Sequence, residues 1–210
     1  MKYKILDNFL NETCFDYLSS LKLRDVGPNE VFSYHNQIYE NGKIKTTCIK
    51  PEILKNLQNS CHKIAIEILN ELAPHKTHLY EYSDFNIIET GKNYIFPIHR
   101  DHVNKLLSGV VYLKPEENTG TIIYDNKKGK NPNEIEWKKN RAVFFARSER
   151  KSWHSYQGDG RSNRLALVYN LMTNRDKLKE VYKIEKRNYF IGMLRYKINP
   201  YVFKYFRFLF

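Results

Sequence analysis

Two histidines and one aspartate have the types and spacing of metal ligands. His99 and Asp101 stand two residues apart. Successive side chains on extended backbone alternate between faces, so we expect both side chains to project to the same side. His154 follows 53 residues after Asp101, with about four predicted strands between them. That is enough chain to travel round a small barrel and return opposite the first pair. The sequence therefore predicts one metal site with three protein ligands.

An arginine near this site has the chemistry to bind a carboxylate. Arg164 follows His154 by ten residues and begins a predicted strand over 164–171. On that strand Arg164, Ala166 and Val168 share one face, which we expect to line the barrel interior. Ala166 leaves room for a ligand there, and the guanidinium offers a planar fork to a carboxylate. Arg161, seven residues after His154, is a competing candidate.

The other histidines lack this ligand-like spacing. His102 would point to the face opposite Asp101 if the backbone is extended there. Packing in the core or contact with solvent is the better interpretation for the remaining four, which are His35, His62, His75 and His78. Two imidazoles and one carboxylate on one face of a metal leave three positions open, which is typical of non-haem Fe(II) oxygenases.

Two helices are predicted before the strand-rich part of the chain. Asn11 can cap a helix whose apolar residues recur at spacings of three. A second helix is predicted from Pro51, which suits a first helical position, to just before Pro74. Its apolar stripe consists of Leu54, Leu57, Cys61, Ile64, Ile68 and Leu72. Between the helices, Asn41-Gly42 predicts a hairpin turn within 31–49.

Short β-rich runs follow from residue 77 onward, separated by turn signals. They cover 77–88, 94–99, 106–113, 120–124, 134–137, 142–146 and 164–171. This spacing predicts an antiparallel sandwich or barrel with helices on one outer face. The fold class we expect is therefore mainly β with flanking helices (α+β).

Composition favours one domain in a reducing compartment. The chain has 210 residues, of which 41% are hydrophobic, enough for one sizeable core. No run of about 18 apolar residues occurs, and the first ten residues do not resemble a secretory signal. Three cysteines without C-x-x-C spacing argue against disulfides and a thiolate zinc site. We expect a soluble cytoplasmic protein with one domain over 1–174, divided into a helical part (1–75) and a β core (76–174).

The last segment, 175–210, is basic and aromatic, and we expect it to be helical. Its ten Lys/Arg and three Asp/Glu contribute +7 to the net charge of +12, and it holds ten aromatic residues. Such a segment can lie peripherally on an anionic membrane or contact a phosphate-bearing substrate. The alternative is a helix docked on the sheet, with its Lys and Arg stems pointing outward. Nucleic acid is not favoured, because no recognised binding motif accompanies the charge.

The motifs together resemble the Fe(II)/2-oxoglutarate-dependent oxygenase superfamily, especially its prolyl-4-hydroxylase-like branch. The resemblance covers about residues 80–172. It rests on His99-x-Asp101, the strands at 107–113 and 120–124, the segment 140–145, Trp153-His154 and Arg164. It implies a double-stranded β-helix, a cupin-like jelly roll, with N-terminal helices packed on one sheet.

The resemblance also implies roles for individual residues. His99, Asp101 and His154 would bind Fe(II) and form the catalytic centre. Arg164 would pair with the distal carboxylate of 2-oxoglutarate, and Tyr112 would donate a hydrogen bond to it. Glu89 stands where many members carry a tyrosine ten residues before the first histidine. The implied reaction is a dioxygenase reaction with O2, a hydroxylation of a C–H bond that releases succinate and CO2.

Other functions remain open from sequence. One is a non-catalytic metal-binding β-barrel that senses or binds a ligand and uses the basic segment for attachment. A cupin-type isomerase shares the architecture, but the H-x-D pair lacks the extra ligands of the usual cupin set. Within the oxygenase interpretation, the substrate is a small molecule, a glycan, a peptidyl side chain or a nucleic-acid base. The Asn41-Gly42 hairpin and the loop 126–132 are expected to form walls of its binding site.

Overall fold

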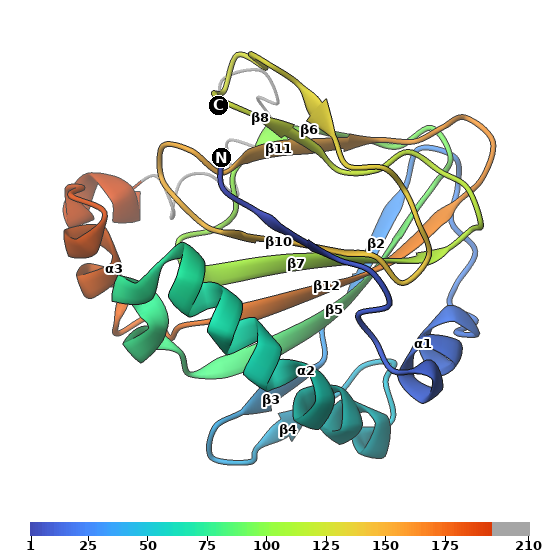
Figure 1. The fold of residues 1–210 in the computed structure, drawn as a ribbon, viewed down its shortest axis with the longest axis horizontal. Coiled ribbons are helices and arrows are strands. Elements are labelled where there is room, and N and C mark those ends of the chain that lie inside the picture. The colour runs from blue at the N-terminus through green and yellow to red at the C-terminus, as the bar shows by residue number, and fades with distance from the viewer. Residues whose placement is uncertain (195–210) are drawn as a thin grey trace.

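Two antiparallel β-sheets face each other, and helices cover the outer face of the larger sheet (Figure 1). The structure is a computed structural model that describes residues 1–194. It is mainly β with a few helices, as predicted. The helices are α1 (Glu12–Ser19), α2 (Pro51–Leu72) and α3 (Leu178–Ile184), with the 3-10 helix η1 at Pro74–Leu79.

The larger sheet has eight strands in the order β1-β10-β7-β12-β5-β3-β4, with β2 also pairing with β5. Their bounds are β1 Lys4–Leu6, β2 Val31–Tyr34, β3 Gln37–Tyr39, β4 Ile44–Lys45, β5 Tyr82–Thr90, β7 Lys105–Lys114, β10 Ala142–Ala146 and β12 Arg164–Met172. The outer faces of its central strands pack against α1 and α2 in the main hydrophobic core. The inner faces look toward the smaller sheet.

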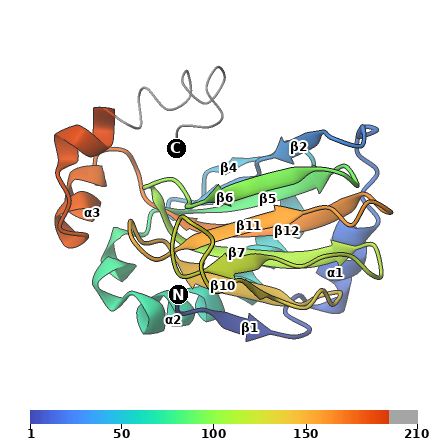
Figure 2. The same cartoon turned by 90° about the horizontal axis from the view of Figure 1, so that it is seen from above.

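The smaller sheet has four strands in the order β6-β11-β8-β9. They are β6 Ile95–His99, β8 Ile122–Tyr124, β9 Asn133–Glu134 and β11 Trp153–Gln157. Figure 2 shows β6 and β11 running over the strands of the larger sheet. A second, smaller cluster of buried apolar side chains fills part of the space between the sheets, including Val110, Phe145 and Ala166.

Local signals account for the ends of the helices. The side chain of Asn11 accepts a hydrogen bond from the Cys14 amide at 2.9 Å and caps α1. Helix α2 begins at Pro51 and ends before Pro74, as predicted. Its buried stripe differs in one respect. Ile64, expected in the stripe, is exposed, while Ala65 and Leu69 are buried.

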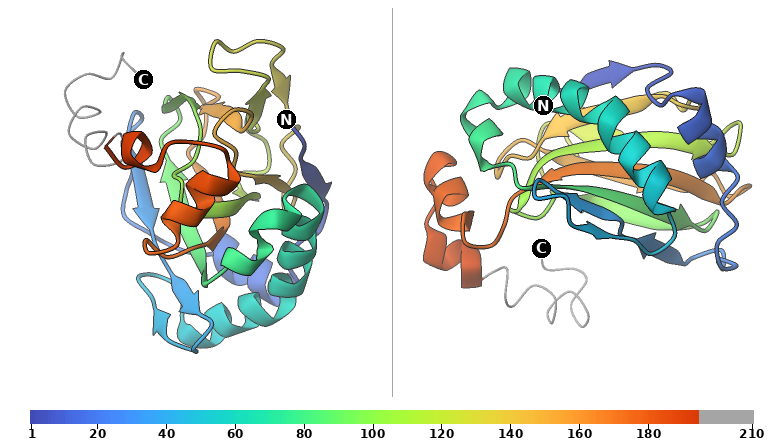
Figure 3. Two further views of the ribbon diagram at one scale, coloured as in Figure 1. Left: turned by 90° about the vertical axis from the view of Figure 1, so that its left-hand side faces the viewer. Right: turned by 90° about the horizontal axis from the view of Figure 1, so that it is seen from below.

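Helix α3 lies at the end of the sheets opposite to α1 (Figure 3). Immediately after it, Glu185 forms a buried ionic cluster with two cations. Its carboxylate lies 2.5 Å from Lys76 Nζ and also pairs with Arg147. Burial lowers the pKa of Lys76, and the charge of Glu185 opposes that shift. Arg147 also pairs with Glu149, so the cluster joins η1, the residues after β10 and the C-terminal segment.

Residues 189–194 are also helical. The part of the predicted helical segment at 195–210 lies outside the described residues. Within residues 1–194, no helix is long and apolar enough to cross a membrane.

Candidate metal centre

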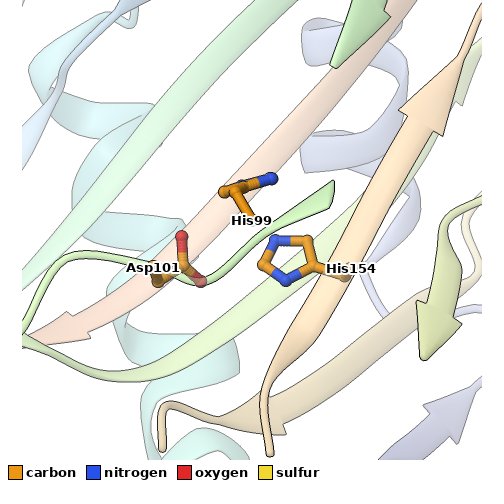
Figure 4. Close-up of side chains that lie close together, drawn as sticks. All are labelled: His99, Asp101 and His154. Atoms are coloured by element: carbon orange, nitrogen blue, oxygen red, sulfur yellow. The ribbon is translucent and has the colours of Figure 1, made fainter. Parts of the chain in front are cut away.

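The structure brings His99, Asp101 and His154 together. One ligand atom from each lies within 4.8 Å of those from the other two. Figure 4 shows the three side chains gathered between the end of β6 and the neighbouring strand β11. His99 is the last residue of β6, Asp101 follows two residues later, and His154 lies on β11 directly opposite His99. The three predicted ligands therefore form one cluster.

In both imidazoles Nδ1 contacts a backbone carbonyl, which leaves Nε2 to bind a metal. The Nδ1 atom of His99 lies 2.9 Å from the Pro97 carbonyl, and that of His154 lies 3.0 Å from the Ser152 carbonyl. An Nδ1–H that donates to a carbonyl leaves the Nε2 lone pair for a metal. Burial is the main cause that lowers the pKa of His99 to about 3, and burial also lowers the pKa of His154. Both rings are therefore neutral near pH 7, as metal ligation requires.

The carboxylate of Asp101 is held from two sides. Lys105 Nζ donates to Oδ1 at 2.8 Å, and Ser108 Oγ donates to Oδ2 at 2.6 Å. Burial alone would raise the pKa of Asp101, but the pKa is lowered overall, above all by the charge of Lys105, which also donates a hydrogen bond to the carboxylate. The aspartate is therefore ionised and fixed in orientation. Both properties favour binding of a divalent cation.

A cavity between the two sheets contains these ligands. It has about 690 Å³ of empty space, part of it open to solvent. Arg164, Ala166 and Val168 all line it, as predicted from the alternation along β12. The opposite face of β12 packs in the main core, as also predicted. The remaining lining residues are Ile88, Thr90, Phe96, Lys105, Ser108, Val110, Thr121, Phe145, Ser155 and Tyr156.

Arg164 is a buried cation without a counter-charge. Its side chain is 6% exposed, and among the residues that the structure describes no carboxylate forms an ion pair with it. Its Nε atom is buried and has no hydrogen-bond partner. The guanidinium carbon lies 3.9 Å from the ring centroid of Tyr156 and 5.3 Å from that of Trp137. Burial lowers the pKa of Arg164, but an arginine keeps its proton in proteins. An anionic ligand would supply the missing charge.

The structure places Tyr112 beside this arginine but outside the cavity lining. Tyr112 is fully buried, stacks on Trp137 with ring centroids 4.5 Å apart, and accepts a hydrogen bond from the Thr121 amide at 2.8 Å. Its predicted contact with 2-oxoglutarate stays a prediction. Tyr156, which the sequence reasoning missed, packs closer to Arg164. The sequence does contain an indication that Tyr156 lines the cavity: it lies two residues after His154, and alternate residues of a strand share a face.

Three other residues named from sequence are not among the clustered ligands. Arg161 is exposed, which favours Arg164 as the carboxylate binder. His102 is not part of the cluster. Glu89 precedes Thr90 and follows Ile88, both of which line the cavity, so its side chain lies on the opposite face of β5. Its Oε2 atom is buried without a partner, and burial raises its pKa.

Solved structures of oxygenases have a similar fold. A prolyl-4-hydroxylase from Pseudomonas putida aligns with a TM-score of 0.56 at 14% identity, over 82% of this chain and 92% of that chain. A 2OG-Fe(II) oxygenase family oxidoreductase from Burkholderia pseudomallei aligns with a TM-score of 0.53 at 12% identity, over 81% and 84% of the two chains. No protein-family model and no curated protein sequence matches the chain.

These comparisons define a class of fold. The chain has the fold of 2OG-Fe(II) oxygenases, and its His-Asp-His cluster is of the kind that holds a metal ion. The resemblance predicted from the motifs is confirmed at this level. At such low identity the alignments show only the fold, so any inference about the reaction depends on the residues that line the cavity.

Proposed function

We propose that this protein is an Fe(II)- and 2-oxoglutarate-dependent dioxygenase, built as a double-stranded β-helix, that hydroxylates a C–H bond with release of succinate and CO2. One observation carries the proposal. A cluster of two neutral imidazoles and one ionised carboxylate shares a cavity with a buried arginine that forms no ion pair with any carboxylate of residues 1–194. The first feature suits a divalent metal, and the second suits a carboxylate ligand.

The ligand set fits Fe(II). His99, Asp101 and His154 would hold the metal, and a site with two histidines and one carboxylate leaves positions for 2-oxoglutarate and O2. Bound together, these groups supply an oxidising chemistry that no side chain of the chain possesses. Lys105 and Ser108 keep the Asp101 carboxylate ionised and aligned before any metal binds.

The other cavity residues fit 2-oxoglutarate. Arg164 would pair with its distal carboxylate, and stacking on Tyr156 holds the guanidinium plane in place. Thr121 and Ser155 add polar groups to the wall. Apolar side chains restrict water near the metal ligands, namely Phe96, Phe145, Ile88 and Val168. A restricted, oriented site lowers the entropic cost of bringing the reactants together.

The proposal is tested by metal-dependent turnover. The purified full chain is titrated anaerobically with Fe(II) and 2-oxoglutarate, the visible charge-transfer band of the complex is followed, and succinate is measured after O2 is admitted. We expect the band and the succinate to require both Fe(II) and Arg164. Tight binding of both ligands without succinate, across a broad panel of acceptors, would instead support a metal-binding ligand sensor. Absence of binding would overturn both functions.

The candidate substrates are those expected from sequence: a small molecule, a glycan or a peptidyl group.

We further propose that the basic C-terminal segment places the enzyme on an anionic membrane. Phe190, Ile191 and Leu194 are 81%, 55% and 59% exposed, and basic residues flank them in the sequence. Exposed apolar side chains beside lysines and arginines suit an anionic interface. Cosedimentation with phosphatidylglycerol vesicles, but not with phosphatidylcholine vesicles, is the expected result, and no difference between them would reject the idea.

A further inference from the structure

A row of polar side chains extends from the metal ligands across the inner face of the larger sheet. Ser108, Asn170 and Asp84 are directly paired residues on the neighbouring strands β7, β12 and β5. Directly paired residues lie on the same face of a sheet with adjacent side chains. Ser108 binds Asp101 at one end of the row. All three are buried, yet the proposed reaction gives no role to Asn170 or Asp84.

The other end of the row is His35, which follows β2. Its Nδ1 atom lies 3.1 and 3.0 Å from the two carboxylate oxygens of Asp84. The hydrogen bond with Asp84 raises the pKa of His35, and burial and the charge of Lys105 oppose that shift. The imidazole is 56% exposed. Its Nε2 atom has no hydrogen-bond partner within the described part of the chain.

The position of His35 is fixed by the next residue. Asn36 is fully buried, and its Oδ1 accepts hydrogen bonds from the amides of Thr47, Cys48 and Ile49 at 2.9, 3.2 and 3.1 Å. Its Nδ2 donates to the carbonyls of Tyr34 and Phe85. This network holds the backbone where β2 passes into β3. An imidazole held on such a frame loses little freedom when it binds a ligand.

The side chains of the row do not fully satisfy one another's hydrogen-bonding groups. Asn170 is fully buried, and its Oδ1 has no hydrogen-bond partner. Its Nδ2 lies 3.5 Å from Asp84 Oδ2, a long contact. Buried polar networks with a purely structural role are normally complete. An incomplete row beside a cavity, with one exposed donor at its end, is instead typical of a ligand-binding surface.

We propose that His35 and Asp84 form a specificity-determining site that binds an anionic oxygen group, a carboxylate or a phosphate, of the substrate. The site rests on the proposed function, because it would hold one end of a molecule whose C–H bond lies at the metal. Asp84 orients the ring, His35 donates a hydrogen bond from Nε2, and Lys105, which lines the cavity, adds positive charge there. Charge-assisted hydrogen bonds of this kind are short and strong.

The chain contains a matched control for His35. His78 also pairs with a carboxylate, with Nε2 at 2.7 Å from Glu180, and its side chain is 58% exposed. It lies in a surface hollow beside α3, and like His35 it is not among the residues that line the metal cavity. Nonspecific binding of anions to the basic protein would act on both histidines alike. Binding at the proposed site would act on His35 alone.

The test is an NMR titration of the full chain labelled with 15N. The chain is first loaded with one equivalent of 2-oxoglutarate and with Zn²⁺, which forms a complex without redox activity. Inorganic phosphate, acetate and neutral glycerol are added in separate series. We expect phosphate or acetate to shift the side-chain signals of His35 along a saturable curve, with little change at His78 and no effect of glycerol. His35→Gln should weaken that binding by about tenfold or more, whereas His78→Gln should leave it unchanged.

The outcomes separate this inference from the proposed function. Equal shifts at His35 and His78, or shifts with glycerol alone, would overturn the anion site. Binding of Zn²⁺ and 2-oxoglutarate without a saturable shift of His35 would overturn the anion site and leave the dioxygenase proposal intact. Failure of the chain to bind Zn²⁺ and 2-oxoglutarate, with saturable phosphate binding at His35, would support the site and count against the dioxygenase.

Discussion

His99 and His154 are directly paired across the neighbouring antiparallel strands β6 and β11, although 55 residues separate them in the chain. The distance between the two imidazoles therefore depends on the register of this pairing. Because side chains alternate along a strand, a slip of one residue would turn His154 to the other face. The candidate metal centre thus depends on sheet pairing as well as on the types of its ligands.

Loss of one ligand should abolish metal binding without unfolding the chain. For Asp101→Ala we expect no Fe(II)-dependent formation of succinate and a loss of metal affinity, because the only carboxylate of the cluster is removed. Calorimetric titration with metal measures the affinity, and circular dichroism checks the fold. His102→Gln is the matched control and should bind metal normally. Normal metal binding by Asp101→Ala would show that the cluster is not the site.

The two residues that hold Asp101 should tune metal affinity. Ser108→Ala and Lys105→Met each remove one hydrogen bond to the carboxylate. We expect each change to weaken metal binding by about 10- to 100-fold, as is usual for groups that orient a metal ligand. Lys114→Met, a change on the same strand that removes a contact with the Leu21 carbonyl, serves as the control. Equal effects of Lys105→Met and Lys114→Met would contradict the orienting role.

The buried guanidinium of Arg164 should determine how tightly the protein binds 2-oxoglutarate. Arg164→Leu removes the only charge proposed to face the distal carboxylate, so we expect binding of 2-oxoglutarate to weaken by about 10- to 100-fold. Arg164→Lys should lose less affinity for 2-oxoglutarate, because lysine keeps the positive charge but lacks the planar guanidinium that can bind a carboxylate through two hydrogen bonds. Exposed Arg161→Leu is the control. The visible band of the Fe(II) complex measures the dissociation constant, and a greater loss with Arg161→Leu would reverse the assignment.

Asn36 should be important for stability. Asn36→Ala would remove the side-chain acceptor of three backbone amides and one donor to each of two carbonyls. We expect the free energy of unfolding in urea to fall by about 3 kcal/mol. Exposed Asn41→Ala, in the turn between β3 and β4, should cost about 0.5 kcal/mol or less. Similar losses for the two variants would refute the role of Asn36.

Acid should weaken the contact between the N-terminal segment and the start of β10. Hydrogen bonds from Arg141 and Lys138 lower the pKa of Asp7 to about 2, from about 3.9 in an unfolded chain. A lowered folded-state pKa contributes stability above pH ~4, and that contribution disappears as the pH falls toward 2. Asp7→Asn should therefore be less stable than the native chain at pH 7, with the difference shrinking between pH 4 and 2. A difference that is independent of pH would rule out this linkage.

The sequence predicted the cavity side of β12 because alternation along one strand is a local property. Arg164, Ala166 and Val168 follow that rule. Strand β11 was missed, because its short run of Trp, His, Ser, Tyr and Gln is mostly polar and shows no apolar alternation. Strand β1 was also missed, since its three residues are held by pairing with the distant β10.

The polar row could not be predicted for a related reason. Asn36 and Asp84 look like ordinary loop and strand residues until pairing with distant segments shows what they contact. The sequence predicts that His35 packs in the core or contacts solvent, and the structure pairs it with Asp84. Nothing in the spacing of these residues indicates that contact, because it depends on how β2 and β3 lie along β5.

The buried cluster of Glu185, Lys76 and Arg147 makes the segment after β12 part of the folding unit. Arg147 also lies 3.4 Å from the backbone oxygen of Asp101 through its Nε atom, so the cluster adjoins the loop that carries a metal ligand. A chain ended before Glu185 would leave the buried cation of Lys76 without its ion-pair partner, whereas Arg147 would keep Glu149. Removal of one partner from a buried ion pair costs about 3–5 kcal/mol. Removal of the C-terminus as far as Glu185 would thus weaken the packing behind the loop that carries Asp101.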